Sequence, residues 1–262
     1  MSGDASSGQS PFGALLGPVP MQTAGERIAE RIVTAIALGE FVPDQRLPTE
    51  RDLAVMLEVS RTTVREALQR LQAAGYVTTK RGRGGGTFVK TGHGPDSDEM
   101  IRRTLVPTWD LLTEVLDLRR LVEQMIARAA AERRGELDIA AIRKAVGEYA
   151  LAADRETSRR ADHALHQAIA KATHNSRLVD LSAEIRREVS LGFEAEPYTP
   201  QVRHRALRQH PRLADAVIAG RPDRAAELAA AHFSLTEDMI RELHARIRVR
   251  SGGLPVAASQ GQ

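Results

Sequence analysis

The sequence contains no cysteine, and this absence removes several kinds of structure. Without thiols the chain forms no disulfide bond and no thiolate metal site, which suits a protein of the reducing cytosol, and we expect a cytoplasmic location. The first two dozen residues are rich in glycine, serine and proline and have no sustained apolar run. Neither a signal peptide nor a membrane-spanning helix is therefore expected, and residues 1–24 and 251–262 are interpreted as flexible tails.

Several motifs that define enzymes are also absent. The glycine-rich stretch at 81–86 meets neither the G-x-x-x-x-G-K-[ST] pattern nor G-x-G-x-x-G, and no helix is expected directly after it, so a nucleotide-binding loop is disfavoured. The H-E-x-x-H motif and the His-Asp dipeptide of phosphohydrolases do not occur. These absences weigh against the corresponding hydrolases.

Net charge is small but unevenly distributed. The formal charge is only +3 over 262 residues, which is enough chain for one large or two modest domains. Residues 60–90 nevertheless carry a strong basic excess, because Glu66 is their only acidic residue. The basic residues in this range are Arg61, Arg65, Arg70, Lys80, Arg81, Arg83 and Lys90. A local excess of this kind favours a partner that presents phosphates.

Residues 60–75 have the pattern of a short amphipathic helix. Ser60 is suited to cap its first turn and Gly75 to end it, while apolar residues recur at the spacing of one helix face at Val64, Ala67, Leu68 and Leu71. Arg61 and Arg65 leave another face, beside the hydroxyls of Thr62 and Thr63, and such groups can read bases and phosphates in a major groove. Taken alone, such a pattern is more often a surface helix with solvated arginines.

The flanking segments favour DNA binding. A first helix is expected at 25–38, and a second begins at Thr49, where Asp52 three residues later is typical of a capping box. A tight turn at 58–59 then leads into the helix at 60–75, which gives a helix-turn-helix. Two β-prone runs at 76–80 and 87–90 surround the glycine-rich basic tip and predict a hairpin that could approach the minor groove.

These segments resemble the winged helix-turn-helix domain of the GntR family of bacterial transcription regulators. The resemblance rests on L-P-T-E-R-D-L-A at 47–54, V-S-R-T-T-V-R-E-A-L at 59–68 and the later G-Y-V at 75–77, and it covers residues 25–90. It implies that arginines corresponding to Arg51, Arg61 and Arg65 contact operator DNA and that a wing tip matching Arg81 and Gly82 enters the minor groove. Glu58 is a departure, because relatives often have glycine or asparagine at this turn.

The remainder of the chain is predicted to be helical. Residues 91–98 have linker composition, and 99–250 form the second predicted domain. A short helix is expected at 98–105, followed by segments at about 108–134, 136–155, 158–173, 176–194, 199–219 and 221–248. The predicted fold class is therefore mainly α, with a winged helix-turn-helix domain followed by an all-α bundle of six or seven helices, large enough for an internal cavity.

One carboxylate and three histidines are candidates for a metal site in this bundle. Asp162 and His166 have i, i+4 spacing and leave one helix face, while His210 and His232 lie among apolar residues of the last two helices. Three imidazoles and a carboxylate suit a divalent transition metal such as Zn, Ni, Mn or Fe. On spacing alone, surface groups or single hydrogen-bonding partners are the more common role of such residues.

The run D-H-A-L-H-Q-A-I at 162–169, followed by Ala172 and Asn175, resembles the FCD effector domain of the FadR subfamily of GntR regulators. The resemblance implies that Asp162, His166, His210 and His232 hold the metal, and it disfavours the acyl-CoA-binding variant of the domain, which lacks these ligands. It further implies a small organic acid as effector, with Arg119 as the pocket arginine that pairs with the acid and with Asn175 among the effector-binding residues. From the residues alone, either Arg119 or its neighbour Arg120 could face inward.

The expected function is a DNA-binding transcription repressor that binds a palindromic operator as a homodimer and does not engage membranes. Dimerisation is expected because one short recognition helix covers few base pairs, whereas paired half-sites add affinity and specificity. The effector would act through the linker on the placement of the DNA-binding domains. The alternative is a metal-dependent enzyme with an appended DNA-binding domain, but no carboxylate positioned as a general base is identifiable.

Overall fold

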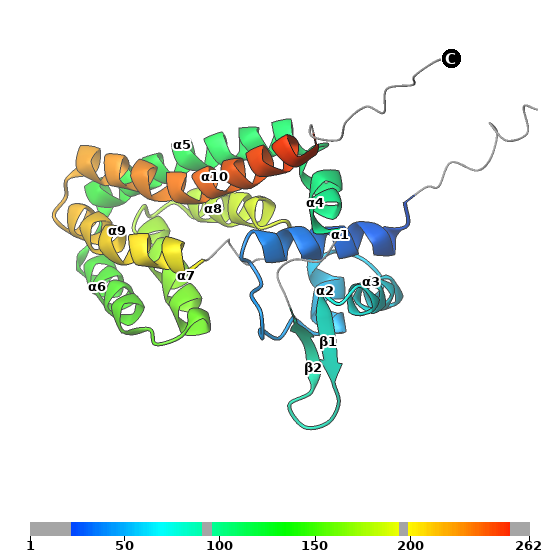
Figure 1. The fold of residues 1–262 in the computed structure, drawn as a ribbon. Coiled ribbons are helices and arrows are strands. Elements are labelled where there is room, and N and C mark those ends of the chain that lie inside the picture. The colour runs from blue at the N-terminus through cyan, green and yellow to red at the C-terminus, as the bar shows by residue number, and fades with distance from the viewer. Residues whose placement is uncertain (1–21, 91–95, 194–198, 252–262) are drawn as a thin grey trace, which may run out of the picture.

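The computed structural model describes residues 22–90, 96–193 and 199–251, which contain ten helices and one two-stranded sheet (Figure 1). The predicted fold class, a winged helix-turn-helix followed by an all-α bundle, is confirmed. Most of the predicted tails and of the predicted linker lie outside the described residues, whereas Ala24 and Ser251, assigned to the tails, belong to the ends of helices. None of the helices in the described part is both long enough and apolar enough to cross a bilayer.

The N-terminal part is a helix-turn-helix with a wing. Its elements are α1 (Ala24–Ala37), α2 (Glu50–Met56), α3 (Arg61–Ala73), β1 (Val77–Lys80) and β2 (Gly86–Val89). The two strands pair antiparallel, with Val77 opposite Val89 and Lys80 opposite Gly86. The hairpin projects from the body of the molecule (Figure 1). At its tip, a Cβ on Gly85 would lie 2.5 Å from the Lys80 carbonyl oxygen, so the tight turn requires glycine there.

The ends of the recognition helix α3 are set by local chemistry, as predicted. Ser60 Oγ accepts a hydrogen bond from the Thr63 amide at 3.1 Å and satisfies one of the free N–H groups of the first turn. Gly75 follows the helix with φ of 81°, a left-handed conformation that costs glycine little. On the face of α3 turned to the interior, Val64, Ala67, Leu68 and Leu71 are buried.

The C-terminal part is a bundle of seven helices in the described residues. They are α4 (Ser97–Leu105), α5 (Trp109–Arg133), α6 (Glu136–Leu151), α7 (Arg155–Lys171), α8 (Ser176–Val189), α9 (Pro200–Ile218) and α10 (Pro222–Ser251). The two longest helices, α5 and α10, run side by side along one edge of the molecule (Figure 1). Each predicted helical segment is present, with ends that differ by a few residues.

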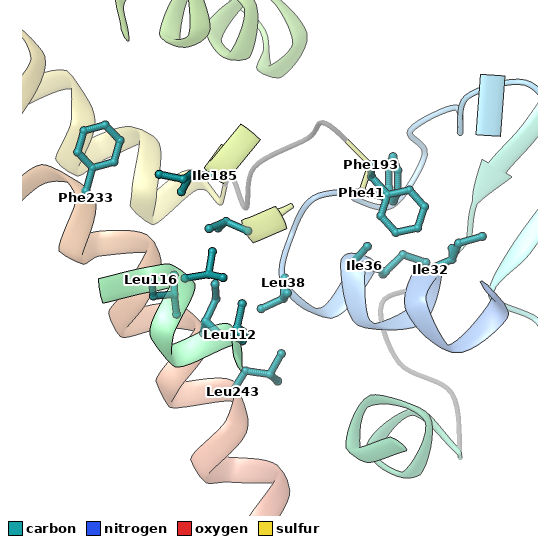
Figure 2. Close-up of a cluster of buried hydrophobic side chains, with 14 of the residues drawn as sticks. Ile32, Ile36, Leu38, Phe41, Leu112, Leu116, Ile185, Phe193, Phe233 and Leu243 are labelled. Carbon is teal, nitrogen blue, oxygen red and sulfur yellow. The ribbon is translucent and has the colours of Figure 1, made fainter. Parts of the chain in front are cut away.

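One apolar core joins the two parts. Figure 2 shows Leu38, at the end of α1, between the side chains of α1 and those of α5 and α10. Nearby, the rings of Phe41 and Phe193 meet edge to face with centroids 5.3 Å apart (Figure 2). Because these residues belong to the connection after α1 and the segment after α8, the DNA-binding part is packed on the bundle through a dry contact.

Glu58, where the sequence departs from the family pattern, has a backbone conformation that is unusual for glutamate. It has φ of 54°, in the left-handed region, and lies between α2 and α3. This conformation costs a residue with a Cβ roughly 1–2 kcal/mol in steric strain. Glycine has no such strain, although it loses more backbone entropy on folding. We expect Glu58→Gly to raise the free energy of unfolding by about 0.5–1 kcal/mol in urea titrations.

The matched control is Gln69→Gly, at an exposed position inside α3 with ordinary helical backbone. That substitution should lower stability by about 1 kcal/mol. Equal destabilisation by both substitutions would contradict the interpretation of the turn.

Candidate metal centre and DNA-reading surface

Three helices bring the predicted ligands to one point. The carboxylate of Asp154 accepts a hydrogen bond from the Thr157 amide at 2.7 Å and starts α7, which fixes the face from which Asp162 and His166 project inward. His210 comes from α9 and His232 from α10. One ligand atom from each of the four residues lies within 4.8 Å of the others.

The histidine nitrogens face one another. His232 Nε2 lies 3.1 Å from His166 Nε2 and 3.3 Å from His210 Nε2. The carboxylate of Asp162 completes the group, with Oδ1 at 3.3 Å from His210 Nε2 and Oδ2 at 4.0 Å from His166 Nε2. The four side chains therefore surround a common centre, with contacts of 3.1–4.0 Å between their ligand atoms.

Burial keeps these imidazoles neutral. His210 is fully buried and His232 is 8% exposed. Burial, followed by the neighbouring His232, lowers the pKa of His210 well below its ordinary value, and burial likewise lowers the pKa of His232, with His166 as the next cause. A neutral imidazole offers a lone pair, so the ring is in the form that binds metal.

Gln209 fixes the tautomer of His232. Its side-chain nitrogen donates to the Ala231 carbonyl at 3.1 Å, which turns its oxygen Oε1 toward His232 Nδ1, 3.0 Å away. Because an amide oxygen only accepts, Nδ1 carries the proton and Nε2 is left as a lone pair aimed at the centre. The sequence interpretation missed Gln209, whose only signal is its position next to His210.

The four side chains fit a transition metal ion. Ligand atoms about 2.1 Å from a metal lie about 3.0–3.4 Å apart when they are neighbours in a tetrahedral or octahedral centre. The contacts of 3.1 and 3.3 Å fall in this range. With its proton held on Nδ1, His232 Nε2 faces two other nitrogens and can only accept, and a shared cation satisfies all of these lone pairs at once. The cluster could therefore hold a metal ion.

Aromatic rings and one arginine surround the centre. Tyr149 packs edge-on to His210, with centroids 4.3 Å apart, and Phe233 lies 5.0 Å from His166. Arg119 is 3% exposed, and its guanidinium lies 4.6 Å from the Phe233 ring centroid. Arg119 is thus the inward-facing member of the predicted pair, whereas Arg120 forms an ion pair with Asp117 on the surface.

A cavity of about 990 Å³ opens from this centre toward the DNA-binding part. Its inner wall includes Asp162, His166, Arg119 and Phe233. Its outer wall includes residues 41–49, the connection between α1 and α2. The cavity also reaches His163, the neighbour of Asp162 on α7.

The structure does not bring Asn175 to the cavity, contrary to its predicted role in effector binding. Asn175 is exposed and precedes α8, where its side-chain oxygen accepts a hydrogen bond from the Arg177 amide at 3.0 Å. The asparagine is explained by capping, because this residue type satisfies free N–H groups at a helix start. Asn175 therefore caps α8 and does not line the cavity in which the effector was expected.

The residues predicted to contact DNA line the exposed side of α2, α3 and the wing. The side chain of Arg51 is 80% exposed, and Arg61 and Thr62 at the start of α3 are also exposed. Arg65 is 54% exposed and forms an ion pair with Glu50 at 2.9 Å, a surface contact that phosphates can replace. Ser60 and Thr63 share a hydroxyl–hydroxyl contact of 2.8 Å at the helix cap.

The wing tip presents Arg81 and Gly82 to the exterior. Both residues are exposed, and Gly82 has φ of 93° with open space around it. The tip is therefore free of steric obstruction on the protein side. Taken together, a recognition helix with exposed arginines and a basic wing on a helical domain are the features of a transcription regulator of the winged-helix class.

Comparison with known proteins gives the family. Residues 24–89 match the bacterial regulatory proteins of the gntR family, and residues 114–235 match the FCD domain. RmpR of Mycobacterium gastri is 34% identical over 226 residues, which cover 82% of this chain and 79% of RmpR. The HTH-type transcriptional regulator LutR of Bacillus subtilis is 32% identical over 211 residues, 77% of this chain and 94% of LutR.

The galactonate operon transcriptional repressor of Escherichia coli is 30% identical over 226 residues, 83% of this chain and 97% of the repressor. The chain belongs to the GntR family and carries an FCD domain, as the sequence motifs had indicated. It is a DNA-binding transcription regulator and not an enzyme. The alternative of a metal-dependent enzyme is not supported.

The hydrogen bond from His232 to Gln209 generates a prediction about metal affinity. Gln209→Leu removes the acceptor of the Nδ1 proton, so His232 can rotate or exchange tautomers. We expect affinity for Zn²⁺, measured by competition with a chromogenic chelator, to fall by about 10- to 100-fold.

Gln201→Leu, near the exposed start of α9, is the matched control and should leave Zn²⁺ affinity unchanged. If Gln209→Leu binds Zn²⁺ as tightly as the unaltered protein, Gln209 does not orient the ligand.

Proposed function

We propose that this chain is a repressor that binds a palindromic operator as a homodimer and responds to a small hydroxy-carboxylate held at a divalent metal in the helical domain. Residues 25–90 would form the DNA-binding domain, 91–98 the linker, and 99–250 the effector-binding and dimerisation domain. Paired half-sites about one helical turn apart would compensate for the short reach of a single α3. In this scheme Arg51, Arg61, Arg65 and the wing tip carry the DNA contacts.

The observation that carries this proposal is the shared wall of the cavity. The same space touches Asp162 and His166 at the metal centre and residues 41–49 of the DNA-binding part. A molecule bound at the centre would therefore lie next to the connection between α1 and α2. This placement supports regulation of DNA binding by a ligand.

The whole connection between α1 and α2, residues 38–49, is hydrogen-bonded on both sides. On the cavity side, the Arg155 guanidinium donates to Gln45 Oε1 at 2.8 Å and to the Glu40 carbonyl at 3.0 Å, and Arg159 donates to the same carbonyl at 3.0 Å. On the other side, the Leu47 amide donates to the Thr87 carbonyl of β2 at 2.8 Å. A shift of α7 would thus be transmitted to the wing through hydrogen bonds, in addition to the predicted route through the linker.

The proposed effector chemistry follows from the groups at the centre. Asp162, His166, His210 and His232 would hold a divalent transition metal, which would supply a Lewis-acidic position for oxygen ligands when bound. Arg119 offers a guanidinium to the carboxylate of the same molecule. The E. coli relative is named for galactonate, a 2-hydroxy acid, and this supports the same chemical class here.

The DNA-binding arm of the proposal is tested by Arg61→Ala. Operator sequences are first selected from random duplexes with the unaltered protein, and Kd values are then measured at several salt concentrations. Because Arg61 is exposed at the start of α3, we expect binding to weaken by about 1–3 kcal/mol, roughly 5- to 150-fold in Kd.

Arg177→Ala, an exposed arginine near the start of α8, is the control and should have no effect. The regulatory arm uses the same operator with Zn²⁺-loaded protein and a series of 2-hydroxy acids from lactate to galactonate. At least one acid should shift the operator Kd by about 5-fold or more, and His210→Ala should abolish the shift. Unaltered operator affinity with every acid would contradict the proposed effector class.

A further inference from the structure

Arg186 differs from Arg155 and Arg159, the other half-buried arginines of the cavity. It lies on α8, is half-buried and lines the cavity, and its guanidinium has no hydrogen bond or ion pair with any residue in the described ranges. In contrast, Arg155 donates to Gln45 Oε1, Arg159 donates to the Glu40 carbonyl, and Arg160 is paired with Glu156. A half-buried cation without a protein partner is costly to retain unless something else pairs with it.

Arg186 lines the same cavity as the metal centre. The lining of this cavity includes Asp162 and His166 of the centre together with the side chains of Arg119 and Arg186. Arg119 reaches this space from α5 and Arg186 reaches it from α8. A molecule at the centre therefore has a guanidinium available from each of two helices.

The balance of charges on the inner cavity wall favours a ligand that carries two negative charges. Arg119 and Arg186 are offset by the carboxylates of Asp162 and Glu123, and the latter is 7% exposed and accepts a hydrogen bond from Ser182 Oγ at 2.6 Å. A divalent metal on the four ligands would add two positive charges that the wall does not offset. A dianion would balance them, whereas a monocarboxylate would leave one buried positive charge.

The size of the cavity agrees with a longer ligand. Its volume of about 990 Å³ lies at the upper end of the range for small-molecule sites, about 300–1,000 Å³. A three-carbon acid would fill only a small part of this space. An acid with a longer chain could bind the centre with one end and approach α8 with the other.

We propose that Arg186 binds a second carboxylate of the effector, so that the effector is a 2-hydroxy-dicarboxylate. The hydroxy-acid end would bind at the metal and Arg119, and the distal carboxylate would form a charge-assisted pair with Arg186. The inference rests on the proposed function, which it narrows from hydroxy acids in general to those with two negative charges. In this arrangement α8 contributes to ligand selectivity through Arg186.

The test compares three probes that have the same 2-hydroxy-acid head: L-lactate, L-malate and L-2-hydroxyglutarate. Calorimetric titration of the full-length, Zn²⁺-loaded protein should give a Kd at least about 10-fold lower for one of the two diacids than for lactate, because a charge-assisted pair contributes about 1.5–3 kcal/mol. Arg186→Gln should remove this preference without changing the Kd of lactate. Arg186→Lys should retain part of it.

Arg187→Gln is the matched control, because Arg187 is the exposed neighbour on the same helix and lines no part of this cavity. It should keep the full preference for the diacid. Equal affinity for lactate and both diacids, or a loss of all three affinities in Arg186→Gln, would overturn the inference and leave the proposed function intact. If Zn²⁺ remains bound but none of the acids binds, both the inference and the proposed effector class are wrong.

Discussion

The candidate site in the helical domain depends on one constraint, which is that three neutral imidazoles face a single point inside the bundle. His166, His210 and His232 come from three different helices, and their Nε2 atoms approach to 3.1 and 3.3 Å. Burial lowers the pKa of each ring and so disfavours the protonated forms that could otherwise hydrogen-bond in this space. A cation at the centre would join α7, α9 and α10 and would also define the inner end of the cavity.

The second constraint is the dual role of the connection between α1 and α2. One side of residues 41–49 lines the cavity and receives hydrogen bonds from Arg155, while the other side is hydrogen-bonded to β2. The aromatic contact of Phe41 with Phe193 holds the same segment on the bundle. The helical domain and the DNA-binding part therefore share a cavity wall, which would give the proposed effector a short physical route to the wing.

Much of the fold could be predicted from local sequence patterns, because caps, glycines and apolar spacing act within a few residues. Ser60 and Gly75 delimit the recognition helix in the structure as they do in the sequence. The meeting of Asp162, His166, His210 and His232 was predictable from the i, i+4 pair together with the family resemblance. Gln209 and Arg186 were not predictable, since their roles depend on which helices meet in space. Asn175 was misassigned because a capping asparagine and a ligand-binding one look alike in sequence.

The central claim is that the histidine cluster is a metal site. It is tested most directly by elemental analysis of the purified full-length protein beside the double variant His166→Ala, His210→Ala. The account predicts about one transition metal ion per chain in the unaltered protein and none in the variant, which removes two of the four ligands. No metal in either protein, even after incubation with Zn²⁺ or Ni²⁺, would contradict the account and leave the DNA-binding part of the assignment standing.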